Sequence, residues 1–442
     1  MSEVQTTYAA MTGEEIVALA RKHTLFEWAA QGAVDPLPVA RAQGVHFWTP
    51  DGRRYLDFNS QLMCVNIGHG HPHVVRAIAE QAERLAYVSP FMATEPRARL
   101  GAKLAAVAPG DIDAFFFTTG GADANEHAIK IAKLYTGRPK ILARYRSYHG
   151  ATTGAATLTG DPRRWPFEPG LPGVVHVLDA YHGIERGWEP VDQALARLEE
   201  TIELEGPKTI AAFILEPVTG TNGILVPPDG YLQGVREICT RHGILLIADE
   251  VMSGFGRTGE WFAVDHWRVV PDILTMAKGL TSGYVPLGAV GVRREIAEFF
   301  RDRVLWSGLT YNSHPLACAA AVATLEVYER EDLIANARRM GAVMRALLAD
   351  LESRHSIVGA VRSIGLFGIV ELVEDRRSRR PLAPFGGTSE PMQRLARFFR
   401  DNGLYTFVRW HTFFTNPPLC ITEADLREGF EIIDRALAAI AP

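Results

Sequence analysis

Between about residue 72 and residue 320, short apolar runs alternate with stretches of helical periodicity, and this alternation limits the possible folds more than any other feature of the chain. It predicts repeated strand–helix–strand units, whose strands form a mostly parallel sheet covered by helices on both faces. The expected strands span residues 114–117, 140–142, 174–178, 210–215, 244–248, 273–276 and 287–292. We therefore predict an α/β protein with this sheet at its centre.

The chain has 442 residues, which is more than a single hydrophobic core usually serves, so we expect more than one domain. A large domain should span residues 72–320. Residues 321–442 should form a smaller α+β domain, because a long helical pattern, a short strand and a final helix follow one another there. Residues 1–71, with a helix over 13–30 and then a hairpin, are expected to join this smaller domain.

Charge and composition exclude several partners. The formal net charge is −5 and the pI is near 6.3, so no basic surface for nucleic acid or anionic lipid is expected. No apolar run approaches the roughly 20 residues that cross a bilayer. The four cysteines are far apart, and the N-terminus lacks the pattern of a signal peptide. We expect a soluble cytoplasmic protein with reduced thiols.

In an open parallel sheet, ligands collect beyond the carboxyl ends of the strands, so the residues after each predicted strand are the first site candidates. After 114–117 the chain reads TTGGADANE and then becomes helical. Glycines at a helix N-terminus let backbone N–H groups close on a phosphate, which the helix dipole also favours. The same residues would equally suit a plain turn. They match neither the GxGxxG motif nor a Walker A loop.

Asp249 and Lys278 each follow a predicted strand. A carboxylate at the end of a buried strand needs a cationic partner. Asp249 could end a Walker B strand, but that requires a Walker A loop, which the sequence lacks; alternatively, it could keep the nitrogen of a pyridine cofactor protonated. Lys278 alone would suit a surface lysine. Its distance from Asp249 along the chain, however, equals about one strand–helix–strand passage, so the two side chains could emerge from nearby strands.

Three further motifs have both a structural and a functional interpretation. Tyr148 could stack on a planar ring or simply pack in the core. Glu216 could be another carboxylate at the ligand edge, or only the end of its strand before a proline. The run HGHPH over 69–73 imitates a metal site, but its imidazoles alternate in a loop broken by glycine and proline. We therefore expect no metal there, and a helix beginning at Pro72 instead.

Together these motifs resemble the class III aminotransferases, the fold-type-I pyridoxal 5′-phosphate (PLP) enzymes that include ω-amino-acid and amine transaminases. The resemblance covers nearly the whole chain, and in order the motifs are TPDGRRYLDF, NIGHGHPHV, TTGGADANEHAIKIA, YHG, ILEPV, GILLIADEVMSGFGRTG, PDILTMAKGL, GLTYNSHPLACAA and NPPLCIT. One motif departs from the family. The phosphate loop reads Gly-Gly-Ala-Asp where many relatives have Gly-Ser-Glu, so backbone contacts should replace the serine hydroxyl.

The resemblance implies a role for each matched residue. Lys278 would hold PLP as a Schiff base and then move the proton of the substrate carbon, while Asp249 would pair with the pyridinium nitrogen. Thr310 would reach the phosphate of the neighbouring subunit, which implies a homodimer, and possibly a tetramer, with shared active sites. The other expected cofactor contacts are Gly120, Gly121 and Ala122 at the phosphate, Tyr148 and Val251 on the two ring faces, and His149 and Glu216.

Three segments, around residues 23–48, 57–72 and 402–422, are similar to the taurine aminotransferase branch of the family. This similarity implies transfer of an amino group from an ω-amino acid or amine, such as taurine or β-alanine, to pyruvate or 2-oxoglutarate in a ping-pong cycle. Phe26, Trp28 and Leu62 would then line the substrate pocket. Arg409 could grip the acidic end of donor or acceptor, because a guanidinium binds carboxylate or sulfonate in a forked geometry. An ordinary surface arginine is the alternative.

Two kinds of rival function stay open at this point. A class III relative with another outcome, such as a dialkylglycine decarboxylase or an aminomutase, would share the motifs. A binding protein could keep the fold without turnover, although the presence of both Lys278 and Asp249 argues against that.

Overall fold

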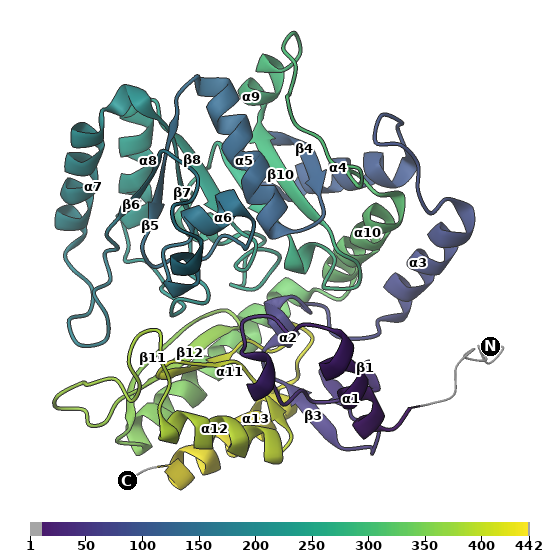
Figure 1. Cartoon of the computed structure of the whole chain (residues 1–442), viewed down its shortest axis with the longest axis vertical. Helices are drawn as coiled ribbons and strands as arrows, with labels where there is room; N and C mark the ends of the chain where they lie inside the picture. The colour runs from purple at the N-terminus through teal and green to yellow at the C-terminus, as the bar shows by residue number, and fades with distance from the viewer. Residues whose placement is uncertain (1–10, 441–442) are drawn as a thin grey trace.

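The large central sheet contains seven strands in the order β4-β10-β9-β8-β7-β5-β6 (Figure 1). They are β4 (Ile112–Thr118), β5 (Lys140–Arg144), β6 (Val174–Val177), β7 (Ile210–Leu215), β8 (Leu245–Asp249), β9 (Ile273–Met276) and β10 (Gly288–Arg293). The pairs from β9 to β6 are parallel, whereas β10 is antiparallel to both of its neighbours. This computed structural model, which describes residues 11–440, confirms the predicted α/β class and the mostly parallel sheet.

Helices cover both faces of this sheet, as the unbroken apolar runs predict. The main ones are α5 (Gly121–Thr136), α7 (Val191–Glu205) and α8 (Tyr231–His242). Ile247 belongs to the apolar cluster of α5, whereas its neighbour Leu246 belongs to the cluster of α7 and α8. Successive side chains of a strand point to opposite faces, so this division shows a sheet buried on both sides.

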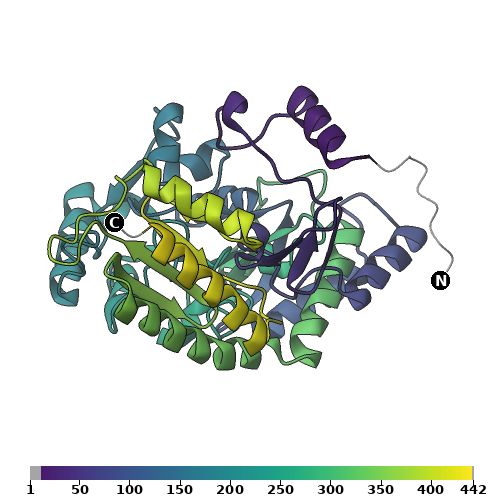
Figure 2. The same ribbon diagram turned by 90° about the horizontal axis from the view of Figure 1, so that it is seen from below.

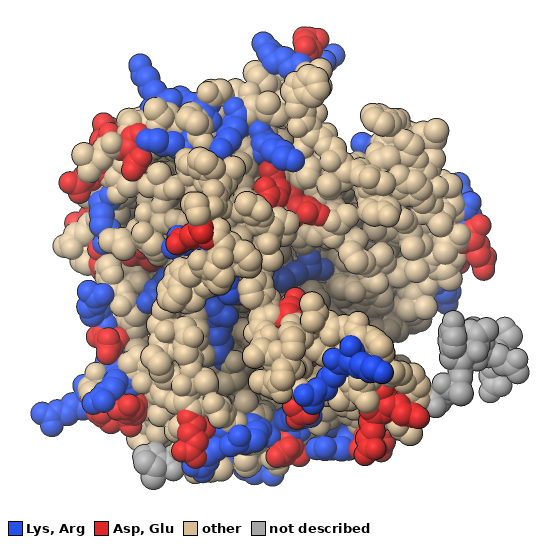
Figure 3. Space-filling view, viewed as in Figure 1, with Lys and Arg blue, Asp and Glu red and all other residues tan. Residues whose placement is uncertain are grey.

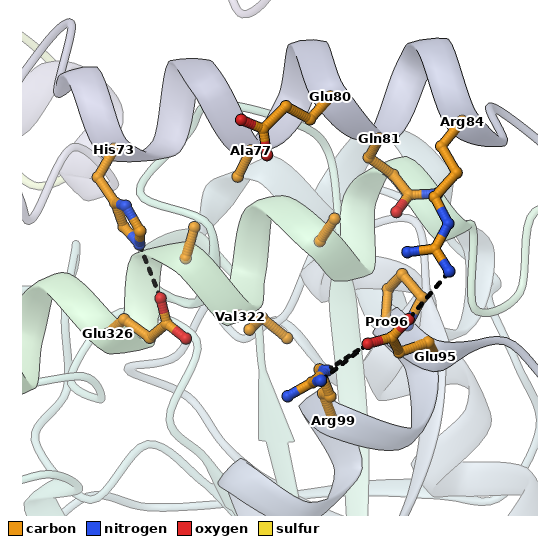
Figure 4. Close-up of a pocket in the computed structure, with 12 residues that line it drawn as sticks. His73, Ala77, Glu80, Gln81, Arg84, Glu95, Pro96, Arg99, Val322 and Glu326 are labelled. Atoms are coloured by element: carbon orange, nitrogen blue, oxygen red, sulfur yellow. Dashed lines mark hydrogen bonds and ion pairs between the residues drawn. The ribbon is translucent and has the colours of Figure 1, made fainter.

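Helix α10 connects the sheet to the rest of the chain and packs against α3 and α4. The remaining helices of this part are α3 (Pro72–Arg84), α4 (Glu95–Val107), α6 (Thr153–Leu158), α9 (Arg294–Phe299) and α10 (Pro315–Arg330). A cavity of about 300 Å³ lies between α3, α4 and α10. Figure 4 shows the ion pairs at its two ends.

The HGHPH run begins α3, as its proline predicts. Pro72 is the first helical residue, and the His71 imidazole accepts the backbone N–H of His73 at 3.2 Å. The three imidazoles bind three different carboxylates rather than one centre: His69 pairs with Asp57, His71 with Glu331 and His73 with Glu326, at 2.9, 2.7 and 2.7 Å.

Two four-stranded sheets form the lower part of Figure 1. One contains β1 (Arg41–Gln43), β2 (His46–Trp48), β3 (Arg54–Asp57) and β13 (Leu404–Tyr405), and the other contains β11 (Val358–Ile364), β12 (Phe367–Leu372), β15 (Thr412–Thr415) and β14 (Val408–Arg409). Because β13 pairs with β3, the N-terminal segment and the C-terminal region share a sheet. That pairing supports the proposed division at residues 71 and 320, which stays a prediction.

Helices α11 (Leu333–Arg354), α12 (Glu390–Asp401) and α13 (Glu423–Ile440) cover these smaller sheets. Figure 2 shows α12 and α13 side by side, with the N-terminal helix at the edge of the molecule. Within residues 11–440, no helix is long and apolar enough to cross a membrane.

The N-terminal helix α1 (Gly13–His23) is shorter than its sequence predicts. The expected extension to residue 30 is wrong, because Thr24 is extended and Trp28 has a left-handed backbone with φ +55°. None of the residues of α1 is buried. Trp28 lies instead in a loop, where its ring meets the Tyr148 ring edge-on at 6.2 Å between centroids.

Candidate active site

A cavity of about 490 Å³ lies between the large sheet and the smaller part of the chain. Figure 3 shows a hollow between the upper and lower parts of the molecule, with Lys or Arg side chains inside it. Among the residues expected at the site, those that line the cavity are Trp28, Leu62, Gly121, Ala122, Tyr148, His149, Glu216, Asp249, Val251, Lys278 and Arg409. Phe26, Gly120 and Thr310 are not among the lining residues.

Asp249 and Lys278 lie at the same edge of the sheet because β8 and β9 are parallel neighbours. Asp249 is the last residue of β8, and Lys278 begins a short 3₁₀ turn, η5 (Lys278–Leu280), just after β9. Lys278 has a left-handed backbone, with φ +41°. Burial lowers the pKa of its amine, although the nearby Cys64 and Asp249 partly oppose this effect. A lowered pKa favours the neutral amine, which is the nucleophilic form.

The Asp249 carboxylate is held by three groups. His149 Nδ1 lies 2.7 Å from Oδ2, the Asn125 amide donates to the same oxygen at 2.8 Å, and the backbone N–H of Val251 donates to Oδ1 at 3.0 Å. The carboxylate is almost completely buried. It is therefore fixed in direction at the cavity wall, and a cationic group in the cavity would complete its charge balance.

The glycine-rich loop begins α5 at the cavity. Gly120 has an extended backbone, with φ 178°, and a Cβ at this position would meet no atom within 4 Å. Gly121 is the first residue of the helix, and a Cβ there would come within 2.8 Å of Val251 Cγ1. The first N–H groups of a helix have no partner inside the helix, so this end can bind an anion.

Glu216 supports the loop that carries Tyr148. Its Oε1 accepts the backbone N–H of Tyr148 at 3.0 Å, and its Oε2 accepts that of Gly220 at 2.7 Å. Burial raises the pKa of this carboxyl. Both oxygens bind backbone N–H groups, so Glu216 both lines the cavity and supports the loop that carries Tyr148.

Arginine side chains form the most basic part of the cavity wall. The guanidinium of Arg163 lies over the Tyr148 ring, with Cζ 3.6 Å from its centroid. Arg163 belongs to the 3₁₀ helix η2 (Pro162–Phe167), and it forms ion pairs with Asp161, to which Arg409 of β14 also binds at 3.0 Å. Burial lowers the pKa of Arg409 to about 10. Arg409 is therefore part of the cavity and not an ordinary surface arginine.

Sequence reasoning missed Asn125, Arg163 and Asp161. Asn125 was within the recognised glycine-rich motif, and its place one helical turn after Gly121 was a usable signal. Arg163 and Asp161 had no such signal, because their segment follows no predicted strand directly. Only the tertiary structure brings η2 over the Tyr148 ring.

The residues present fit PLP. An anion-binding helix end, a largely buried amine and an oriented carboxylate line one cavity, and these suit the phosphate, the aldehyde and the pyridine nitrogen of the cofactor. Tyr148 and Val251 line the same cavity and offer surfaces for a planar ring. Of the residues described, Asn125 Oδ1 and His149 Nε2 are buried without a hydrogen-bond partner, so this region also retains unused polar groups.

Comparisons with known proteins agree with this geometry. The solved structure of taurine:2-oxoglutarate aminotransferase from Bifidobacterium kashiwanohense, in complex with PLP and glutamate, matches with a TM-score of 0.95 and 41% identity, and covers 98% of this chain and 99% of that chain. Taurine–pyruvate aminotransferase of Bilophila wadsworthia is 34% identical over 96% of this chain and 97% of its own length. Putrescine–pyruvate aminotransferase of Pseudomonas aeruginosa is 34% identical over 91% of both chains.

The sequence model of the family described as aminotransferase class-III matches residues 29–437, which is most of the chain. Together with the site and the relatives, this match settles the family that the motifs suggested. The chain belongs to the class III aminotransferases, and it is a PLP-dependent transaminase of fold type I.

Proposed function

We propose that this enzyme moves the amino group of an ω-amino acid to a keto acid, and that an arginine holds the acidic end of the donor. The observation that carries the proposal is the shared cavity, which is lined by the reactive amine of Lys278 and by the guanidinium groups of Arg163 and Arg409. A donor such as taurine or β-alanine has an amine at one end and an acid at the other, so it complements both features.

Within this proposal, PLP supplies the electron sink that stabilises charge at the substrate carbon. Lys278 would bind the cofactor and would move the proton of the substrate carbon, and its lowered pKa favours the neutral amine that these roles need. Asp249 would hold the pyridine nitrogen, and its three hydrogen-bond donors keep it in place for that task. The helix end at Gly120–Ala122 would bind the phosphate.

The substrate end of the cavity is built from Trp28, Leu62, Arg163 and Arg409. Arg163 is the better clamp for the donor acid, because its plane is already fixed on the Tyr148 ring and lies near Trp28. A planar guanidinium binds carboxylate or sulfonate through two parallel N–H groups. Donor and acceptor would use the cavity in turn, in a ping-pong order, and the similarity to taurine aminotransferases supports this choice of donor.

A homodimer is part of the proposal. Thr310 is exposed and its carbonyl accepts the hydroxyl of Tyr87 at 2.9 Å, so it stands outside the cavity of its own chain. Large apolar side chains surround this region without cover from the described chain: Phe91, Met92, Trp306 and Tyr311 are 101%, 57%, 76% and 57% exposed. An apolar surface of this kind is typical of an interface, and it would bring Thr310 to a second subunit.

The test is a panel of donors given to the purified PLP enzyme: taurine, β-alanine, 4-aminobutyrate, putrescine and 1-phenylethylamine. Loss of the visible cofactor absorbance and formation of the carbonyl product without CO₂ would identify transamination. We expect the acidic donors to react fastest. A preference for putrescine would favour a diamine enzyme, CO₂ release would favour a decarboxylase, and an amino group moved within one molecule would favour an aminomutase. No reaction with any donor would favour a binding protein.

Arg163→Met tests the clamp. Because it removes charge-assisted hydrogen bonds, it should lower kcat/KM for taurine and β-alanine by about 10- to 100-fold. Arg164→Met is the matched control, since Arg164 is the next residue of η2 but does not line the cavity. Equal losses for acidic donors and for 1-phenylethylamine would contradict the clamp.

A further inference from the structure

Asp161 is a completely buried carboxylate that joins the two arginines of the cavity. Its Oδ1 accepts the backbone N–H and the Nε of Arg163, both at 3.0 Å, while its Oδ2 accepts one terminal nitrogen of Arg409, also at 3.0 Å. The Asn222 amide donates to the same Oδ2 at 3.1 Å. These partners come from η2, from β14 and from the loop after β7, so Asp161 connects three separate segments at the cavity wall.

The hydrogen bonds to Asp161 determine which edge of the Arg163 guanidinium remains available to a ligand. Arg163 uses its Nε and one terminal nitrogen on Asp161, and this same terminal nitrogen also donates to Thr221 Oγ1 at 2.8 Å. The outer edge of its guanidinium is therefore the part left for a substrate. Arg409 binds Asp161 through one terminal nitrogen, and its Nε is buried without a hydrogen-bond partner among the described residues.

The charges of this cluster do not balance. Two guanidinium groups share one carboxylate, which leaves one positive charge without a partner inside the cluster. The lowered pKa of Arg409 agrees with this imbalance, because burial and then the neighbouring charge of Arg163 oppose its protonated form, whereas Asp161 favours it. One acidic group from a ligand would complete the cluster.

We propose that Asp161 is a positioning residue, which holds Arg163 and Arg409 together as one anion site and thereby gives the enzyme its preference for donors with an acidic end. The proposal rests on the proposed function. It assigns to Asp161 no contact with substrate or cofactor: the residue acts by fixing the edge that each arginine presents and by reducing the repulsion between them.

Asp161→Asn tests this role, because it keeps the shape of the side chain and removes its charge. The arginines should then repel each other and lose their orientation. For taurine and β-alanine we expect KM to rise by about 10-fold or more, with a smaller change in kcat. For 1-phenylethylamine, which has no acidic group, kcat/KM should stay within about 3-fold. Asp161→Glu should restore part of the affinity for the acidic donors.

Two controls separate positioning from general damage. Asp179→Asn changes another buried carboxylate of the large domain, which accepts the backbone N–H of Arg146 at 2.7 Å and does not line the cavity. This variant should change kcat/KM for acidic donors and for the neutral donor by the same factor. If Asp161→Asn does not fold, Asn222→Ala is the second variant. This variant removes one hydrogen bond to Asp161. It should raise KM for the acidic donors by about 3- to 10-fold and leave KM for the neutral donor unchanged.

Direct binding distinguishes this proposal from the proposed function. Ethanesulfonate and propionate carry the acidic group but no amine, and calorimetry measures their affinity for the PLP enzyme without turnover. Asp161→Asn should weaken both ligands by about 10-fold, even if no ω-amino acid turns out to be a donor. Unchanged binding, or equal losses for acidic and neutral donors, would overturn the proposal. Tighter binding would also overturn it, because Asp161 would then compete with the ligand.

Discussion

Arg257 is a completely buried arginine whose loss should destabilise the whole molecule. Its side chain donates to the carbonyls of Leu366 and Pro417 at 3.0 and 2.6 Å, and to Ser60 Oγ and Asn66 Oδ1 at 2.8 and 2.9 Å. These partners lie in the N-terminal segment and in the C-terminal part, and none of them is a carboxylate. Arg257 therefore connects several segments of the chain by hydrogen bonds to neutral acceptors, without an ion pair to any of these partners.

Arg257→Met would keep much of the side-chain volume and remove every donor. The Ser60 and Asn66 side chains can turn to other partners, but the two backbone carbonyls cannot. Leaving a buried acceptor unsatisfied costs about 1–3 kcal/mol, so two of them should cost about 2–6 kcal/mol. The variant also no longer buries a charge, and the unfavourable burial of that charge is visible in the pKa of Arg257, which is lowered to about 10. This gain offsets part of the cost of the two unsatisfied carbonyls. We expect a net loss of about 3 kcal/mol in the free energy of unfolding.

Unfolding in urea, followed by tryptophan fluorescence, measures this loss. Arg338→Met is the matched control. Arg338 donates to the carbonyl of Gly259 and pairs with Glu260, but its side chain is 54% exposed, so water can replace the lost donors. Its variant should lose less than about 1 kcal/mol. If the two variants lost the same stability, or if Arg257→Met lost less than about 1 kcal/mol, the buried donors would not stabilise the fold as argued.

Three further predictions concern stability. Burial raises the pKa of the Glu250 carboxyl from 4.5 to about 7, so between these pH values the native state holds a proton that the unfolded chain has released. The free energy of unfolding should therefore fall as the pH rises through this range. Urea titrations at several pH values should show this fall in the unmodified enzyme but not in Glu250→Gln. In thermal unfolding, Gly365→Ala should lower the melting temperature more than Gly137→Ala does. Both glycines have positive φ, but only a Cβ at Gly365 meets backbone, 2.3 Å from the carbonyl carbon of Thr258. Phe413→Ala should cost about 3–5 kcal/mol in the same urea assay, because this completely buried ring would leave a cavity; a loss below about 1 kcal/mol would contradict that packing.

Local patterns in the sequence predicted the central features well. Each strand of the large sheet is an apolar run with a clear end, so its position and the polar residue after it could be read directly. Asp249 and Lys278 are examples, because each directly follows such a run. The chain distance between the two residues suggested that they could emerge from nearby strands, and the structure shows β8 and β9 as adjacent parallel strands.

The parts that sequence reasoning missed depend on distant contacts. Trp28 was placed in the helix predicted over residues 13–30, yet its backbone is left-handed and its ring packs on Tyr148. Arg163 lies far along the chain from Arg409, yet both bind the same carboxylate, that of Asp161. Hydrophobic periodicity contains no information on such loop-to-loop contacts, because these positions are set by packing between the two parts of the chain.

We propose that Lys278, just after β9, is the residue that holds PLP, and chemical trapping can locate that bond. Borohydride reduction of the purified enzyme fixes the cofactor to the amine that binds it, and peptide mass spectrometry then locates the modified residue. We expect a pyridoxyl group on the peptide that contains Lys278, and none on that peptide in Lys278→Ala. A modified residue elsewhere, or turnover of an amino donor that survives in Lys278→Ala, would contradict it.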